Sequence, residues 1–199
     1  ASPLSRNTLH FKEVLKRENV KAIPHRLVEI PTDGPGEDLE TLFRTFAPPL
    51  IVRPVGKADG VMIAKTYPDF VDMLEEAFKE TDQIILEEYI PGTKASVGVI
   101  EGYRDHERYA LPPVSQDVFT HEVKKELEEL ARHIHNILGM RHYSRSDFLV
   151  SPTRGIFVTQ VVPLPSLHND SVFHRALTTV GAPVSHFIDH ILQRALHKR

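Results

Sequence analysis

The sequence predicts an α+β protein of two lobes, each with a mainly antiparallel sheet and packed helices. Three observations support this prediction. Helical and strand patterns are mixed along the chain, and most neighbouring strands are joined by short turns, as in β-hairpins. A Pro-Gly pair at 91–92 separates two sets of such elements. Each set contains a long helical pattern with one apolar side. We therefore place the first lobe at 1–91 and the second at 92–199.

The first lobe contains alternating helical and strand patterns. Asn7 and Thr8 are residues that cap helices, and they open the first helical pattern. In a later pattern Pro68 stands in the first turn, and Phe70 and Leu74 follow at helical spacing. In order, we expect a helix at 7–19, a strand at 25–30, a short helix at 37–46, a hairpin of strands 50–54 and 61–66, a helix at 68–80 and a strand at 84–90.

The second lobe contains the longest helical pattern of the chain. Val123, Leu127, Leu130 and Ile134 repeat every three or four residues, and Gly139 is well placed to end the helix. In order, we expect strands at 95–102 and 107–112, a helix at 118–138, a hairpin over 142–162, and two helices near 170–180 and 184–197.

Composition excludes several classes of protein. The 199 residues are 41% hydrophobic, which is enough for a real core, and the net charge of −3 gives no basic footprint for nucleic acid or an anionic membrane. No run approaches the roughly 20 apolar residues of a membrane span, and ASPLSRNTLH lacks the apolar stretch of a leader peptide. The absence of cysteine excludes disulfides and thiolate metal sites and fits a reducing compartment. We predict a soluble, cytoplasmic protein.

Two segments of the first lobe have a functional and an ordinary interpretation. The loop 53-RPVGKADGV-61 offers glycine N–H groups and positive charge to an anion, but taken alone it is better interpreted as an ordinary turn with solvated charges. The segment 86-LEEYIPG-92 ends a strand with two acids, an aromatic and an aliphatic residue. It is either an exposed strand end or a hinge wall for a flat base.

Two further segments lie in the second lobe. In 143-YSRSDFLV-150 the alternation of a strand puts Tyr143, Arg145 and Asp147 on one face, where the last two form either a salt bridge or part of a phosphate or carboxylate site. His186 and His190 lie one helical turn apart. They flank an apolar stripe without a nearby cluster to complete a metal shell, so surface histidines are the better interpretation.

Taken in order, these segments resemble the ATP-grasp domain of the D-alanine–D-alanine ligase family, over about residues 5–197. The resemblance is specific in 84-IILEEYIPG-92 and 143-YSRSDFLV-150 and looser in 156-IFVTQVVPLPSLHNDSV-172. It implies two lobes that clamp ATP, with Mg²⁺ ions bridging the phosphates to acids of the second lobe. It also implies phosphorylation of one D-alanine and capture of the acyl phosphate by the amine of a second.

The resemblance assigns roles to residues of this chain. In the nucleotide site, Arg53 stands where the family has a phosphate-binding lysine, and 56–60 matches the glycine loop over the phosphates, including Gly56, Lys57 and Gly60. The adenine hinge is matched by Glu87, Glu88, Tyr89 and Ile90, with Glu87 as the acid that contacts the adenine amino group. At the reaction centre the matching residues are Arg145, the metal-binding acid Asp147, and Ser171 near the carboxylate of the second substrate.

The departures from the family pattern lie mainly at positions matched to the metal, nucleotide and oxyanion sites. Gln160 replaces a bridging glutamate and Val162 replaces a metal-binding asparagine, so only Asp147 and Gln160 can offer metal ligands. Mg²⁺ prefers oxygen ligands in near-octahedral geometry, and valine offers none. Elsewhere, Thr8 stands for a nucleotide-binding lysine, Lys94 for the acid that holds the ribose, and Ser166 for a glycine near the oxyanion. The family's lysine-bearing substrate loop is shortened between 112 and 119, and its N-terminal substrate domain has no counterpart in the sequence.

Three hypotheses follow. The first is a degenerate ATP-grasp module that binds ATP weakly, with Mg²⁺ at most loosely held and with impaired or absent ligase activity. The second is the catalytic half of a carboxylate–amine ligase, completed by a separate substrate-binding domain or protein partner. The third is a scaffold or interaction protein whose cleft binds no nucleotide. None of them involves nucleic acid or a membrane.

Overall fold

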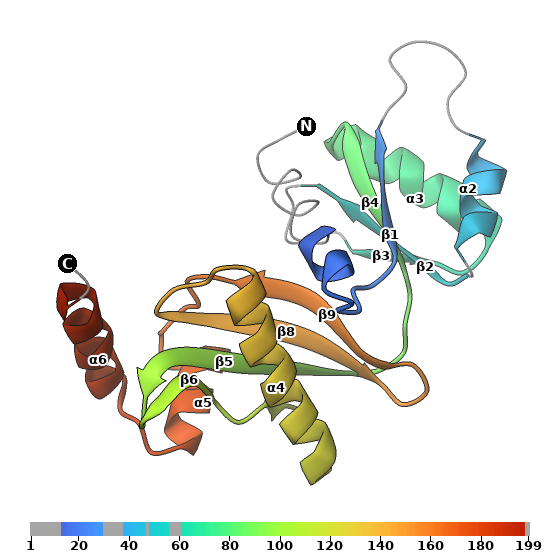
Figure 1. Ribbon diagram of the computed structural model, residues 1–199. Coiled ribbons are helices and arrows are strands. Elements are labelled where there is room, and N and C mark those ends of the chain that lie inside the picture. The colour runs from blue at the N-terminus through green and yellow to red at the C-terminus, as the bar shows by residue number, and fades with distance from the viewer. Residues whose placement is uncertain (1–12, 30–37, 47, 56–60, 198–199) are drawn as a thin grey trace. The chain divides into compact units, whose positions relative to one another are not determined.

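A computed structural model describes residues 13–29, 38–46, 48–55 and 61–197 (Figure 1). The chain divides into two compact units: unit 1 comprises 1–10 and 23–91, and unit 2 comprises 11–22 and 92–199. The described part of this first segment, 13–22, therefore packs with unit 2, although it was expected in the first lobe. The reason is burial, because Leu15 and Val20 lie in the core of unit 2 and are 0% and 7% exposed.

The described residues of unit 1 form a four-stranded antiparallel sheet packed against two helices (Figure 1). The strand order is β1-β4-β2-β3. The elements are β1 (His25–Glu29), α2 (Leu39–Thr45), β2 (Leu50–Pro54), β3 (Met62–Ala64), α3 (Tyr67–Glu80) and β4 (Gln83–Glu88). Helix α3 begins at a capping box, in which Thr66 and Asp69 satisfy each other's backbone N–H groups, and it buries Phe70 and Leu74 against the sheet. Over the described residues, the elements expected in 25–30, 37–46 and 50–90 correspond to β1, α2, β2, β3, α3 and β4.

Unit 2 is a five-stranded antiparallel sheet with helices on both faces. Its order is β6-β5-β8-β9, and β7 pairs with β5. The elements are β5 (Thr93–Tyr103), β6 (His106–Ala110), β7 (Val114–Ser115), α4 (His121–Ile137), β8 (Tyr143–Ser151), β9 (Gly155–Val162), α5 (Val172–Thr179) and α6 (Val184–His197). Among the described residues, helical geometry also covers 13–17.

The two faces of the unit 2 sheet have separate cores. Helix α4 packs Leu127, Ala131 and Ile134 on one face, and α5 and α6 cover the other face with Phe173 and Phe187. These helices follow the predicted ranges, while the two-residue strand β7 was not predicted. Within the described part of the chain, no helix is both long and apolar enough to cross a membrane.

Candidate functional site

In unit 1 the structure pairs Arg53 with Glu87. These residues lie on the antiparallel neighbours β2 and β4, at diagonal positions that long side chains can bridge. Arg53 Nη2 donates to Glu87 Oε2 at 2.9 Å, and the side chains are 44% and 12% exposed. The residue matched to the phosphate and the residue matched to adenine therefore contact each other.

In the hinge segment at the end of β4, two backbone N–H groups donate hydrogen bonds to other residues of unit 1. The N–H of Glu88 donates to Pro24 O at 3.1 Å, and the N–H of Tyr89 donates to Pro49 O at 3.1 Å. Ile90 is buried, whereas Tyr89 is 40% exposed. This segment therefore offers a base an exposed aromatic surface more readily than the N–H groups of Glu88 and Tyr89. The predicted phosphate loop (Gly56, Lys57, Gly60) and Thr8 lie outside the described residues.

In unit 2, three side chains of β5 and β8 form a hydrogen-bonded chain. Ser96 Oγ donates to Asp147 Oδ1 at 2.7 Å, and Arg145 Nη2 donates to Asp147 Oδ2 at 2.9 Å. Ser96 and Asp147 are directly opposite in the strand register, and Arg145 lies two residues before Asp147 on the same face of β8. Arg145 and Asp147 are each 19% exposed. Both carboxylate oxygens of Asp147 therefore already accept hydrogen bonds from the protein.

The metal-site pair of the sequence prediction is brought together by a β-bulge. Asp147 lies opposite Gln160 on β9, but the next residue, Phe148, lies opposite Val158, which leaves Thr159 as the extra residue. Val158 points into the core shared with α4. Without the extra residue, strict alternation would turn Gln160 toward that core as well. The bulge instead aligns the exposed Gln160 with Asp147, and Val162 with Arg145.

The remaining predicted residues of unit 2 have ordinary surroundings. Lys94 is exposed on β5, and Ser166 is exposed in the loop after β9. Ser171, matched to a substrate-binding serine, is the N-cap of α5, where its Oγ accepts from the N–H of His174 at 3.2 Å. Ser171 is only 7% exposed. In this position it satisfies a helix N-terminus, as serine commonly does.

The donor set around Asp147 does not fit a firmly bound pair of Mg²⁺ ions. It consists of one carboxylate, one neutral amide oxygen from Gln160, and the hydrocarbon side chain of Val162. The guanidinium of Arg145 also competes for the same carboxylate. Among the described residues, no group of three or more His, Asp or Glu side chains could hold a metal ion.

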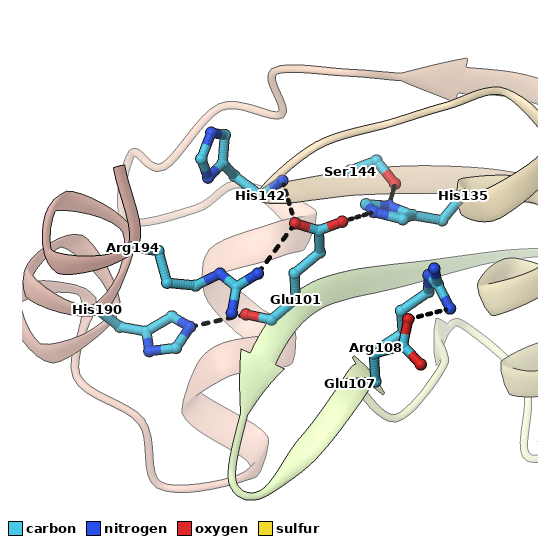
Figure 2. Close-up of polar contacts among 8 residues, drawn as sticks. All are labelled: Glu101, Glu107, Arg108, His135, His142, Ser144, His190 and Arg194. Atoms are coloured by element: carbon cyan, nitrogen blue, oxygen red, sulfur yellow. Dashed lines mark hydrogen bonds and ion pairs between the residues drawn. The ribbon is translucent and has the colours of Figure 1, made fainter. Parts of the chain in front are cut away.

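A second polar network, on the α4 side of unit 2, was not predicted from the sequence (Figure 2). Glu101 Oε2 accepts from the backbone N–H of His142 at 3.1 Å and from Arg194 at 3.3 Å. Its Oε1 lies 3.6 Å from Nε2 of the buried His135, whose Nδ1 is 2.7 Å from Ser144 Oγ. Figure 2 shows Glu101 between the α6 residue Arg194 and His135. Glu101 thus connects three elements of unit 2.

Burial sets the charge of His135. Because the ring is removed from water, burial lowers the pKa of His135 below its ordinary value, and the Glu101 carboxylate raises this pKa only in part. At 3.6 Å the two groups form an ion pair only if the ring is protonated. Ser144 is fully buried, so this set of residues is structural and does not present a nucleophile to solvent.

Comparisons with known proteins find similarity to D-alanine–D-alanine ligases. Residues 103–193 match the family model of the D-ala D-ala ligase C-terminus. The D-alanine–D-alanine ligase of Pelobacter propionicus is 26% identical over 186 residues, which are 84% of this chain and 58% of that protein. The corresponding ligase of Geobacter sulfurreducens is 27% identical over 187 residues, 84% of this chain and 57% of its own length.

Solved structures show the same fold. The D-alanine–D-alanine ligase of Coxiella burnetii superposes with a TM-score of 0.77 at 20% identity, covering 92% of this chain and 55% of that one. A ligase of Bacillus anthracis complexed with ATP gives a TM-score of 0.76 at 21% identity, covering 94% of this chain and 63% of that one. The chain is therefore similar to D-alanine–D-alanine ligases, has the ATP-grasp fold of the two solved ones, and spans less than two thirds of the length of each of these four proteins.

Proposed function

We propose that this chain is a degenerate ATP-grasp module that binds nucleotide weakly and has impaired or absent ligase activity. The relatives are named D-alanine–D-alanine ligases, and one solved relative is complexed with ATP. Nucleotide binding and carboxylate–amine ligation are therefore the activities against which this chain has to be tested.

One observation carries the proposal: Gln160 and Val162 stand directly opposite Asp147 and Arg145. At these positions the family resemblance calls for a glutamate and an asparagine, both of which bring oxygen ligands to Mg²⁺. Loss of one preorganised charge-stabilising group costs a factor of about 10² to 10³ in rate. Two substitutions at one metal site are therefore sufficient to make ligation slow, although such losses do not simply add.

Two arginines support the nucleotide half of the proposal. The Nε atoms of Arg53 and Arg145 are buried and have no hydrogen-bond partner among the described residues. Each guanidinium also carries one ion pair, to Glu87 and Asp147 respectively. A guanidinium has five N–H donors, so it can bind a phosphate oxygen while it keeps its carboxylate partner.

The test has two measurements on the full chain. Titration calorimetry with ATP and with ADP, each with and without Mg²⁺, is expected to show weak binding that Mg²⁺ changes little. A phosphate-release assay with D-alanine is expected to show no turnover above the rate without D-alanine. Turnover at ordinary enzyme rates would overturn the proposed loss of activity, and absence of any nucleotide binding would favour a scaffold function instead.

A second candidate is the catalytic half of a ligase, because the chain spans only 58% of the Pelobacter propionicus relative. In that case D-alanine-dependent phosphate release would appear when a protein that supplies the missing part is added. Co-purification from the native source, followed by the same assay on the complex, separates this candidate from the degenerate module.

A further inference from the structure

Unit 2 has a surface cavity of about 520 Å³ where β6 and α4 meet. Its volume lies in the range of small-molecule sites. The residues that line it are polar or charged: His106, Glu107, Arg108, Arg132, His133 and Asn136. None of them belongs to the ligase-like set of Asp147, Arg145 and Gln160. That set lies on the other face of the sheet, where Tyr143, which shares a strand face with Arg145 and Asp147, packs against Phe173 of α5.

The lining is rich in hydrogen-bond donors and carries a positive charge. Two arginines and one glutamate give a formal charge of +1 with both histidines neutral, and protonated histidines would raise it to +3. The amide of Asn136 and the neutral imidazoles can also donate hydrogen bonds. Guanidinium groups suit the geometry of phosphate and carboxylate oxygens, to which they donate two parallel hydrogen bonds.

Carboxylates of the protein neutralise this positive charge only in part. Arg108 Nη1 lies 2.8 Å from Glu107 Oε1, but Glu107 is 81% exposed, and surface pairs of this kind contribute little. Arg132 has no acidic partner within 4.0 Å among the described residues. One turn earlier in α4, burial raises the pKa of Glu128, and the charge of Arg132 lowers that pKa in part. A ligand anion would therefore displace one exposed carboxylate at most.

The donors stand on rigid elements. Arg132 and Asn136 are one turn apart on α4, and the neighbouring Ala131 and Ile134 are fully buried in the core. Arg108 is held in the register of β6, directly opposite Glu101 of β5. A site that is fixed by a helix and a strand loses little entropy when a ligand binds.

We propose that this cavity is a binding site for a phosphate group, carried by a small phosphorylated molecule or present as free phosphate. The anion contacts Arg132 and Arg108, with Asn136 and the two histidines as further donors. The remaining volume holds the organic part of a phosphate ester. The proposal does not depend on the proposed nucleotide binding, because its residues lie on the α4 face of unit 2.

The pKa of His135 should report whether the cavity is occupied. The positive charge of Arg108 lowers the pKa of His135, after the larger effect of burial, and Glu101 acts in the opposite direction. Arg194 reaches the same carboxylate from α6. A phosphate dianion beside Arg108 would offset the charge of that arginine. Binding in the cavity is therefore expected to raise the pKa of His135, whereas binding elsewhere would leave it unchanged.

The experiment is an NMR titration of the full chain with inorganic phosphate and with glycerol phosphate, at ionic strength held constant with chloride. Saturable shifts are expected for the amides of 106–108 and 132–136, together with a raised pKa of the His135 ring. Tighter binding of glycerol phosphate would identify a phosphorylated small molecule as the ligand class, and equal or weaker binding would identify free phosphate.

Substitutions in opposite directions make the test specific. Arg132→Ala is expected to weaken phosphate binding about tenfold, since it removes a charged hydrogen bond, and Glu107→Gln is expected to tighten binding because it removes the competing carboxylate. Arg175→Ala, at an exposed position of α5, is the matched control and should leave binding unchanged. Arg132→Gln repeats the test with a larger polar side chain if the alanine variant is poorly folded. Shifts that follow total salt, or equal affinities of the Arg132 and Arg175 variants, would overturn the proposal.

Discussion

Units 1 and 2 each carry an arginine–carboxylate pair at a residue matched to the ligase site, and the two pairs differ in their surroundings. Both have an N–O distance of 2.9 Å. In unit 1 the pair bridges two strands, and Arg53 is 44% exposed. In unit 2 both partners are 19% exposed and lie on one strand, and Asp147 also accepts a hydrogen bond from Ser96. The two pairs therefore have equal N–O distances, but we expect them to differ in strength because their surroundings differ.

The difference lies in how readily each arginine can turn to a ligand. Exposed pairs contribute about 0–1 kcal/mol because water competes for both partners. Only the Arg53 side of the unit 1 pair is open to water, since Glu87 is 12% exposed, so Arg53 is the arginine that a ligand can reach more readily. The carboxylate of Asp147 accepts from both Ser96 and Arg145, so its role in this chain is structural as well as electrostatic. In unit 2, a stabilising pair occupies the place where the family resemblance implies a metal.

The largest expected effect comes from restoring the metal ligands. Gln160→Glu combined with Val162→Asn should raise the affinity for Mn²⁺ by about a hundredfold, since even residues behind the ligands change metal affinity by about 10–100-fold. Calorimetry with Mn²⁺ measures this change. The control is Thr159→Glu, which adds the same charge at the bulge residue and lies off the Asp147 register. Equal affinities of the two variants would show that added charge alone, without ligand geometry, attracts the ion.

The next effect is the cost of removing Asp147. Asp147→Ala leaves the charge of Arg145 without its partner and frees Ser96, so it should lower the stability of unit 2 by about 2–3 kcal/mol. Ser96→Ala removes one hydrogen bond only and should cost about 1 kcal/mol. Amide hydrogen exchange of β8 reports this unit separately. Equal costs for the two variants would contradict the view that Asp147 mainly stabilises Arg145.

His135 is the fully buried case: it faces Glu101 with 0% exposure, and burial lowers its pKa more than the Glu101 carboxylate raises it. Its pKa is lower in the folded than in the unfolded state, so between the two values the unfolded chain binds more protons. Stability should then fall as the pH drops below about 6.5, by at most about 1.4 kcal/mol per pH unit. His135→Gln should remove this slope, and His186→Gln, at an exposed position of α6, should not. Urea unfolding between pH 5 and 7.5 provides the measurement.

The sequence predicted those features that depend on local pattern. Strand alternation placed Arg145 and Asp147 on one face, and the structure joins them by a hydrogen bond. The capped and amphipathic helices α3 and α4 were recognised for the same reason, because caps and apolar spacing are written in neighbouring residues. Family resemblance, rather than pattern, brought Gln160 into the predicted metal site.

The features that were missed depend on contacts between distant segments. Alternation from Ile156 would put Gln160 in the core, and only the unpaired Thr159 turns it toward Asp147. No local signal in TQVV marks that bulge. The same holds for Glu101, which joins α6, α4 and the turn before β8, and for the segment 13–22, which packs with unit 2. Their surroundings are defined only after the sheet has formed.

The smallest expected effect separates the two arginines directly. Arg53→Lys keeps the charge at a half-exposed position and should change the stability of unit 1 by less than about 0.5 kcal/mol. Arg145→Lys should cost unit 2 about 1 kcal/mol, because a lysine ammonium cannot reproduce the planar guanidinium beside the partly buried Asp147. Hydrogen exchange of β2 and β8 in the two variants gives both numbers. A cost at Arg53 equal to that at Arg145 would mean that exposure does not decide the strength of these pairs, and the distinction between the two units would fail.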